Sequence, residues 1–199
     1  MIDDIEIDLK NYHAIAGVDE AGRGPLVGAV VAAAVILDDA HPIEGLNDSK
    51  KLTAKKREQL ALQIKKYAKS WAVSSVGPKI IDEINILQAS LLAMKQAIES
   101  LNITADFALI DGNKLPDLNC DGAAIVKGDA KVAAIAAASI LAKVERDEQM
   151  LALHNEYPQY EFNRHKGYPT KLHFALLEEF GPCDEHRKSF APVRRLLIG

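Results

Sequence analysis

The stretch AIAGVDEAGRGPLVGAVVAAAVIL, residues 14–37, decides which fold we expect. Residues 14–18 are apolar and predict a short buried strand, and the β-branched, apolar run 27–37 predicts a second strand. The segment GRGP, residues 22–25, lies between them and predicts a tight connection. Because such a connection is too short for a parallel crossover, the two strands are expected to be antiparallel.

Strand and helix patterns alternate along the rest of the chain. The expected elements are a helix over 54–69, a strand over 71–76, a helix over 79–100 that breaks near Asn85, strands over 107–110 and 123–126, an alanine-rich helix from Lys131, a loop over 157–169, and helices over 170–180 and 190–197. This order predicts an α/β sandwich around a mixed sheet, with a helical C-terminal appendage. The alanines of the long helix let it pack close to the sheet.

The composition is that of an ordinary globular domain. The chain has 199 residues, of which 48% are hydrophobic and 26% charged, enough to bury a core without disulfides. Cys120 and Cys183 predict free thiols in a reducing cytosol, although the sequence leaves a bridge between them open. The acidic residues 1–10 do not resemble a secretory signal, and the apolar run 26–37 is shorter than the roughly 20 residues that cross a bilayer. We therefore expect a soluble, cytoplasmic protein with no membrane partner.

The formal net charge of −4 argues against a nucleic-acid binder, but the distribution of charge matters more than its sum. Basic residues gather in two stretches of the sequence. The first holds Lys50, Lys51, Lys55, Lys56, Arg57, Lys65, Lys66 and Lys69, and the second holds Arg164, Lys166, Lys171, Arg187, Lys188, Arg194 and Arg195. On charge alone, these stretches are either nucleic-acid contacts or two solvated faces.

Carboxylates follow three of the predicted strands. Asp19 and Glu20 come directly after AIAGV, Asp111 after FALI, and Asp129 after AIVKG at the start of the alanine-rich helix. Singly, Asp129 is typical of a helix cap and Asp111 of a turn. Together they predict a site where cations offset the repulsion among carboxylates, and ligands that are all oxygen favour Mg²⁺ or Mn²⁺. No close group of His and Cys indicates zinc.

The glycine-rich segment GRGPLVG, residues 22–28, matches neither common phosphate-binding motif. No Gly-Lys-Ser/Thr follows it, as a Walker loop requires. Pro25 lacks a backbone N–H and the segment leads into a strand, which excludes a dinucleotide fingerprint. It is either a tight hairpin or a bare backbone that approaches a ligand, with Arg23 available for phosphate; its place beside two carboxylates favours the ligand.

Six motifs together resemble the type 2 ribonucleases H. They are DEAGRGP at 19–25, LNDSKKL at 46–52, IDGN at 110–113, KGD at 127–129, AASILAKVERD at 137–147 and HKGYPT at 165–170. The resemblance spans nearly the whole chain and implies an RNase H-like fold. Residues 1–156 would form the catalytic domain and residues 157–199 a loop and helical appendage of the same unit. Arg23 and Pro25 resemble the bacterial ribonuclease HII branch rather than ribonuclease HIII.

The resemblance also implies roles for individual residues. The metal-binding and catalytic carboxylates would be Asp19, Glu20, Asp111 and Asp129. Backbone groups of Gly22, Arg23 and Gly24 would sense the ribose 2′-OH, and Tyr168 would stack on the neighbouring sugar. The candidate phosphate contacts are Lys50, Lys127, Ser139, Lys143 and Arg146. The alternatives are that Lys143 and Arg146 are surface charges and that Tyr168 only packs the C-terminal helices onto the core.

The activity implied by the resemblance is cleavage of RNA in duplexes. The substrates would be RNA–DNA hybrids and duplex DNA with single ribonucleotides, cut by two-metal phosphodiester hydrolysis with Mn²⁺ or Mg²⁺ in a monomer. The sequence leaves open whether a sliding clamp binds the C-terminus. The alternatives are a non-catalytic nucleic-acid-binding module and another metal-dependent nuclease with the same fold. Four carboxylates argue against the first, and the Gly-Arg-Gly segment with Tyr168 argues against the second.

Overall fold

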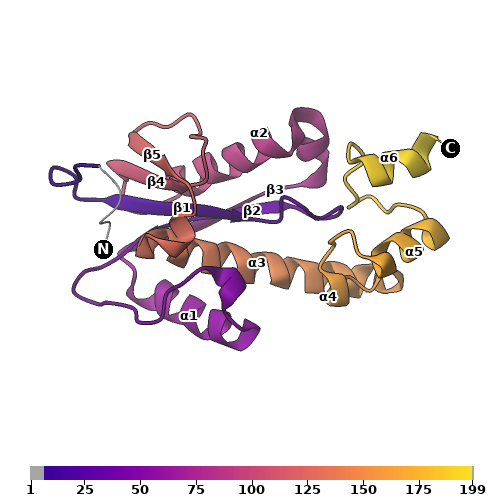
Figure 1. Ribbon diagram of the computed structural model, residues 1–199, viewed down its shortest axis with the longest axis horizontal. Helices are drawn as coiled ribbons and strands as arrows, with labels where there is room; N and C mark the ends of the chain where they lie inside the picture. The colour runs from indigo at the N-terminus through magenta and orange to yellow at the C-terminus, as the bar shows by residue number, and fades with distance from the viewer. Residues whose placement is uncertain (1–6, 199) are drawn as a thin grey trace.

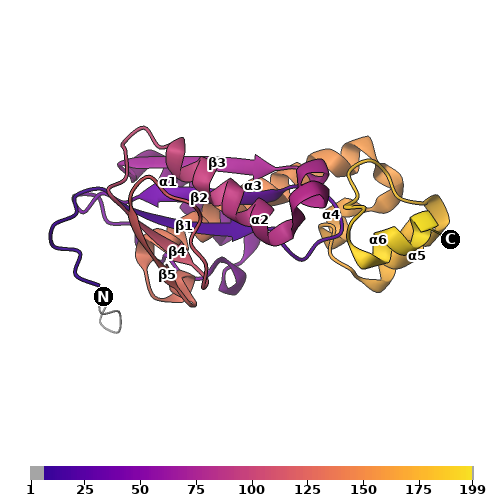
Figure 2. The ribbon, with the colours of Figure 1, turned by 90° about the horizontal axis from the view of Figure 1, so that it is seen from above.

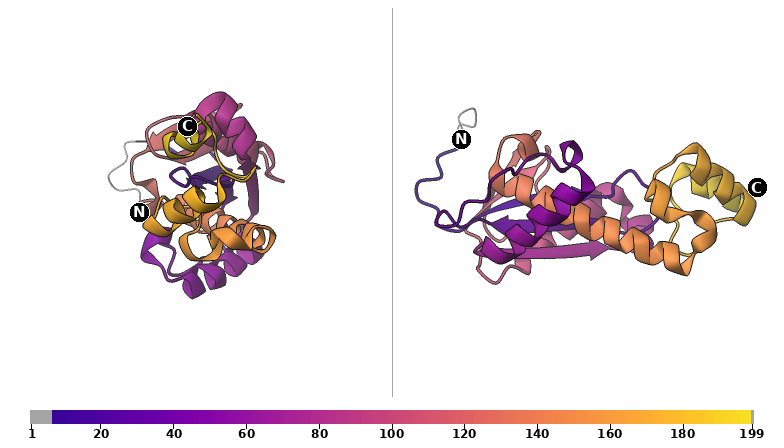
Figure 3. Two further views of the ribbon diagram at one scale, coloured as in Figure 1. Left: turned by 90° about the vertical axis from the view of Figure 1, so that its right-hand side faces the viewer. Right: turned by 90° about the horizontal axis from the view of Figure 1, so that it is seen from below.

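A five-stranded sheet lies between two layers of helices in the computed structural model, which describes residues 7–198 (Figure 1). Residues 1–6, most of the acidic stretch considered above, and residue 199 lie outside the described residues. Helix α2 (Pro78–Glu99) covers one face of the sheet, and α1 (Ala54–Tyr67) and α3 (Ala133–Glu156) cover the other (Figures 1 and 3). The predicted α/β sandwich is confirmed.

The sheet is mixed, as predicted, and has the order β3-β2-β1-β4-β5 (Figure 2). Its strands are β1 (Ile15–Ala21), β2 (Val30–Ile36), β3 (Ser70–Val76), β4 (Phe107–Asp111) and β5 (Asp121–Ile125). Strand β1 is antiparallel to β2, which is antiparallel to β3, whereas β4 runs parallel to both β1 and β5. The expected antiparallel opening pair is therefore confirmed.

The connection between β1 and β2 differs from the prediction. Strand β1 continues to Ala21, which pairs with Val31, so Asp19 and Glu20 lie within the strand and not after it. Residues 22–29 form a longer loop instead of a tight hairpin. Its backbone bonds go to the C-terminal segment: the N–H of Leu26 donates to Gly167 O at 2.8 Å, and that of Gly28 to Glu185 O at 2.9 Å.

The long helices begin and end close to their predicted bounds. The predicted break in α2 is confirmed, because Asn85 has non-helical backbone angles with φ 67°. Helix α3 begins at Ala133 with Val132 as its N-cap, and Asp129 lies before it in a short 3-10 helix, η2 (Gly128–Ala130). The interpretation of Asp129 as the cap of the long helix is therefore wrong.

Helices α4 to α6 gather beyond one end of the sheet, where α3 reaches them (Figures 1 and 2). The predicted loop over 157–169 is wrong, since it contains η3 (Pro158–Tyr160) and α4 (Phe162–His165). Helices α5 (Lys171–Phe180) and α6 (Ala191–Ile198) follow as predicted. A small core holds this end together: Val27 of the β1–β2 loop packs with Met150 of α3 and with Tyr160 and Phe162.

Helix α3 packs directly on β1 because the sequence supplies small residues on both sides. A Cβ on Gly17 would lie 2.1 Å from the backbone carbonyl carbon of Ala134. Because that distance is a steric clash, only glycine fits at this position. Ala137, Ala138 and Ala142 of α3 are fully buried against β2 and α1. The expected close packing of the alanine-rich helix is confirmed.

Cys120 and Cys183 are free thiols, as expected. Among residues 7–198, no helix is long and apolar enough to cross a membrane.

Candidate active site

The four predicted carboxylates lie at one end of the sheet, near the C-terminal ends of β1, β4 and β5. Val18 of β1 pairs with Ile110 of the parallel strand β4, so Asp19 and Asp111 occupy adjacent positions on neighbouring strands. Beyond β5, the chain turns into η2. There Asp111 Oδ1 accepts hydrogen bonds from the backbone N–H groups of Gly128, at 2.7 Å, and Asp129, at 3.4 Å. Asp111 thus links β4 to the segment that carries Asp129.

Burial and mutual repulsion raise the pKa of three of these carboxyl groups. Asp19 is only 5% exposed, and this burial, with the charges of Glu20 and Asp111, raises its pKa well above the ordinary value. Burial also raises the pKa of Glu20, although the Arg23 guanidinium opposes the rise. The pKa of Asp129 is raised by burial and by the charges of Asp111 and Asp48. A bound cation would relieve this repulsion.

The donor set fits a hard divalent cation, because every candidate ligand atom is a carboxylate oxygen. Within the described part of the chain, no three His, Cys, Asp or Glu side chains are grouped closely enough to hold an ion as they stand. Glu20 is turned toward Arg23, whose Nη1 lies 3.3 Å from Glu20 Oε1, and Asp111 is engaged by Gly128. Side-chain rotation is therefore needed to bring the carboxylates onto one ion.

A cleft of about 250 Å³ adjoins the carboxylates and collects most of the predicted substrate contacts. The predicted residues that line it are Asp19, Glu20, Gly22, Arg23, Gly24, Lys50, Ser139, Lys143, Arg146 and Tyr168. Asp111, Asp129 and Lys127 do not line it. Lys127 is exposed and has a left-handed backbone, with φ 58°, between β5 and η2.

The candidate phosphate contacts on α3 differ in how they are placed. Ser139 is buried and its Oγ donates to Ser49 Oγ at 2.8 Å, whereas Lys143 Nζ pairs with Asp147 at 2.7 Å. Arg146 is only 1% exposed and donates to two backbone carbonyls, those of residues 166 and 27. The alternative that Arg146 is a surface charge is therefore wrong.

The glycine-rich loop and Tyr168 are neighbours on the wall of the cleft. A Cβ on Gly24 would lie 3.7 Å from Tyr168 Cε1, and Tyr168 is 42% exposed. The Arg146 Cζ lies 6.0 Å from the centroid of the same ring. At Gly22 the φ is +97° and a Cβ would lie 2.1 Å from Arg146 Nε, so glycine is required there. The loop therefore presents bare backbone beside an aromatic ring.

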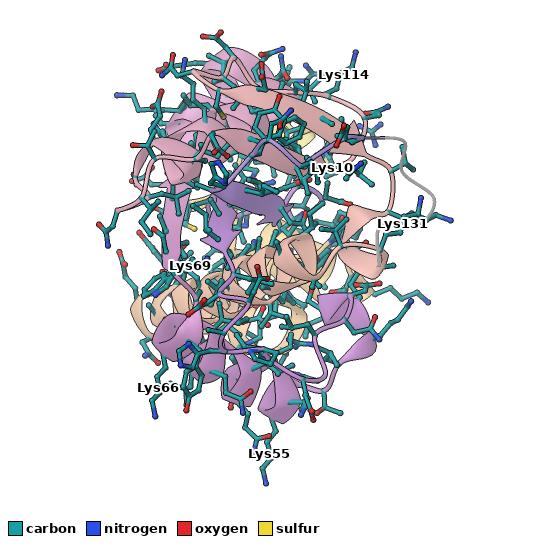
Figure 4. All side chains as sticks on the ribbon, turned by 90° about the vertical axis from the view of Figure 1, so that its left-hand side faces the viewer. Lys10, Lys55, Lys66, Lys69, Lys114 and Lys131 are labelled. Carbon is teal, nitrogen blue, oxygen red and sulfur yellow. The ribbon has the colours of Figure 1, made fainter. Side chains whose placement is uncertain are left out.

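The two basic stretches of the sequence have different surroundings. Lys55 and Lys66 project outward from α1, away from the body of the protein, as expected of a solvated face (Figure 4). Arg187 belongs to the second basic stretch, but it is fully buried, so the interpretation as a solvated face is wrong for this residue. Its guanidinium donates to backbone carbonyls of the glycine-rich loop. A charged residue alone gives no signal of such a role in the sequence.

Asp48 is a further residue that the sequence reasoning did not single out, and it lies near Asp129. It caps the short helix η1 (Ser49–Lys51), and its charge acts on Asp129. The sequence did contain a signal for this residue, because Asp48 belongs to LNDSKKL, one of the six motifs that carry the family resemblance.

A family model described as Ribonuclease HII matches residues 16–193. The chain belongs to the ribonuclease HII family. Ribonuclease HII of Aliivibrio salmonicida is 60% identical over 188 residues, which cover 94% of this chain and 91% of that one. Ribonuclease HII of Polynucleobacter asymbioticus is also 60% identical, over 95% of this chain and 98% of the relative. The chain is accordingly a ribonuclease H, an endonuclease of the hydrolase class.

A solved structure confirms the fold implied by the sequence resemblance. The crystal structure of ribonuclease H2 from Pyrococcus horikoshii superposes with a TM-score of 0.76 at 30% identity. The match covers 92% of this chain and 97% of that one. The RNase H-like mixed sheet with a helical C-terminal segment is therefore confirmed.

Proposed function

We propose that this enzyme hydrolyses the RNA strand of RNA–DNA hybrids and cuts 5′ of single ribonucleotides embedded in duplex DNA. The products would be a 3′-OH and a 5′-phosphate. The observation that carries the proposal is one cleft lined both by Asp19 and Glu20 and by the bare backbone of residues 22–24. Carboxylates suit metal-assisted phosphodiester hydrolysis, and an uncovered backbone suits recognition of a sugar rather than of bases.

Asp19, Glu20, Asp111 and Asp129 would hold two Mg²⁺ or Mn²⁺ ions, in keeping with the general dependence of the family on divalent metals. When bound, the ions would supply an activated water and offset the charge that develops on the leaving 3′-oxygen. The protein contributes the fixed positions of the carboxylates. Asp111 is oriented by the N–H of Gly128, and Asp19 by the N–H of Glu20, which donates to its Oδ1 at 2.7 Å.

Substrate recognition would rely on the backbone and sugars of the nucleic acid. The backbone of residues 22–24 would contact the ribose 2′-OH, and Tyr168 would pack on the next sugar. Lys50, Lys127, Ser139, Lys143 and Arg146 would contribute to phosphate binding. Because the loop over 22–29 is bonded to the C-terminal segment, residues 157–199 would act with residues 1–156 as one catalytic unit in a monomer.

The test is cleavage of two matched duplexes, one a full RNA–DNA hybrid and one DNA with a single ribonucleotide. Each is incubated with the enzyme in Mg²⁺, in Mn²⁺ and in EDTA. We expect both duplexes to be cut with either ion and neither in EDTA, and an all-DNA duplex to remain intact. Cleavage in EDTA, or equal cleavage of the all-DNA duplex, would contradict the proposal.

A further inference from the structure

A single buried guanidinium is bonded to four carbonyls of the glycine-rich loop. Arg187 lies between α5 and α6, and its side chain has no exposed surface. Its Nη2 donates to Gly22 O at 2.6 Å, its Nη1 to Arg23 O at 3.0 Å and Pro25 O at 2.7 Å, and its Nε to Gly28 O at 3.0 Å. The loop is thus folded around a cation that comes from the far end of the sequence.

Backbone and neighbouring side chains complete this arrangement. The N–H of Arg187 donates to Leu26 O at 2.8 Å, and Arg146 Nη2 lies 3.4 Å from Val27 O. Across residues 22–28, every carbonyl except that of Gly24 therefore receives a bond from one of the two buried arginines. Neither arginine forms an ion pair with a carboxylate in the described part of the chain, so the carbonyls replace water around their charges.

The carbonyl bonds also determine where the loop's N–H groups point. In a trans peptide, the C=O of one residue and the N–H of the next point in opposite directions, and the described chain has no cis peptide. Since the carbonyls of Gly22 and Arg23 point at Arg187, the N–H groups of Arg23 and Gly24 point away from it. Neither N–H donates to a protein acceptor within residues 7–198. They are therefore free to donate to an oxygen in the cleft.

We propose that Arg187 is the positioning residue of the loop that recognises the ribose. By bonding the carbonyls on its inner side, it holds the N–H groups of Arg23 and Gly24 outward, toward the 2′-oxygen. This role rests on the proposed function, because it assumes that those N–H groups contact a ribose. Arginine is needed because four carbonyls in different directions require a planar fork of N–H donors, which the ammonium of lysine does not provide.

The test compares R187K with the wild type and with I98A. Ile98 is buried near the C-terminal end of α2, whereas Asp82, which accepts from the N–H groups of Lys188 and Ser189, lies near the N-terminal end. I98A therefore lowers stability without touching the segment that carries Arg187. Two quantities are measured below the melting temperature of each variant. One is kcat/KM on the single-ribonucleotide duplex, and the other is the ratio of Kd for an all-DNA duplex to Kd for the ribonucleotide duplex, measured in Ca²⁺. For R187K we expect kcat/KM to fall by roughly 10–10²-fold and the Kd ratio to approach one.

I98A should keep the wild-type Kd ratio although its melting temperature is lowered. A folded R187K with the wild-type ratio would overturn the proposal, whatever its stability. Should R187K fail to fold, R187Q, which keeps two N–H donors, takes its place under the same criteria.

Hydrogen exchange separates this proposal from the proposed function. The amides of Leu26 and Gly28 are bonded to the C-terminal segment and report whether the loop is docked. In R187K they should exchange faster relative to the amides of β2, but not in I98A. If the wild type itself showed no preference for the ribonucleotide duplex, the proposed function would fail. The exchange rates would then decide alone: faster exchange at Leu26 and Gly28 supports the positioning role, and unchanged exchange overturns it.

Discussion

The carboxylate of Asp19 is almost fully buried in β1 and lies beside the charges of Glu20 and Asp111. We predict that Asp19→Asn and Asp111→Asn each abolish cleavage, because each removes a negative ligand. The amide introduced by Asp111→Asn keeps an oxygen that can accept from the N–H of Gly128, so the fold should survive. In EDTA, the melting temperature should hold or rise, since repulsion is relieved. Cleavage at near the wild-type rate by either variant would exclude these residues as metal ligands.

Gly24 and Arg23 distinguish recognition by backbone from recognition by side chain. A Cβ at Gly24 meets only the Tyr168 ring, at an ordinary contact distance of 3.7 Å, so Gly24→Val should fold normally. It should nevertheless lower kcat/KM on the single-ribonucleotide duplex by about 10²-fold, by blocking approach of the ribose. Arg23→Ala, whose side chain is half exposed, should cost less. Full activity of Gly24→Val with unchanged preference for the ribonucleotide would rule out sensing by the backbone.

Tyr168 is exposed enough to pack on a sugar, and its removal should affect one substrate more than the other. We predict that Tyr168→Ala lowers kcat/KM on the single-ribonucleotide duplex more than on a long RNA–DNA hybrid. Tyr168→Phe should retain most activity if packing dominates. The measurement is the ratio of the two kcat/KM values beside a melting curve. An unchanged ratio with a lowered melting temperature would make Tyr168 a structural residue.

The residue types and their positions in the sequence drew attention to the carboxylates, but they did not predict that two arginines are buried. Asp19, Asp111 and Asp129 stand out in the sequence because each follows an apolar strand pattern. Arg187 does not, because its burial depends on carbonyls that lie as many as 165 residues away in the chain. A local pattern carries no information about such partners.

The short elements over 157–187 are joined by a chain of histidines whose tautomers follow from their bonds. The N–H of Cys183 donates to His186 Nδ1 at 3.0 Å, so His186 carries its proton on Nε2. That N–H donates to His173 Nε2 at 3.2 Å, and His173 Nδ1 then donates to Tyr168 O at 3.0 Å. Protonation of either ring breaks a link. Burial, together with the neighbouring histidines, lowers the pKa of both His173 and His186 to about 4.

This histidine chain should make the C-terminal end sensitive to acid. The folded pKa of about 4 lies below the ordinary 6.5, so the unfolded state binds more protons between these values and stability falls as the pH falls. Between pH 6.5 and about 4, each ring contributes a loss of about 1.4 kcal/mol per pH unit, and below that window the loss levels off. Urea unfolding of wild type and His173→Gln between pH 7.5 and 5 isolates the effect, since both share the same carboxylates. A stability difference that stays constant with pH would contradict it.

Helices and strands were predicted well where the pattern of their own side chains determines where they form. The period of α1 and the break at Asn85 in α2 are local features, and both were found. The end of β1 was placed too early because Ala21 is held by pairing with Val31, a contact made across the sheet. Helix α4 was missed because Pro158, Gly167 and Pro169 around it are typical of loops.

On the scale of the whole molecule, the sheet and the C-terminal helices meet at the loop over 22–28. Alternation of strands and helices was enough to predict the sandwich, and the order of the strands follows from it only in part. The docking of residues 157–187 onto that loop was not predictable, because it depends on backbone hydrogen bonds such as those of Leu26 and Gly28. These contacts place Tyr168 and the glycine-rich backbone on one cleft with Asp19 and Glu20.

Mapping the ends of the products from a duplex with one ribonucleotide tests the account most directly. Metal-assisted attack by water predicts a nick on the 5′ side of the ribonucleotide, leaving a 3′-OH on the DNA and a 5′-phosphate on the ribonucleotide. The nick should require Mg²⁺ or Mn²⁺ and disappear in Asp111→Asn. A nick on the 3′ side that leaves a 2′,3′-cyclic phosphate would show that the ribose 2′-OH is the nucleophile, and it would contradict the account.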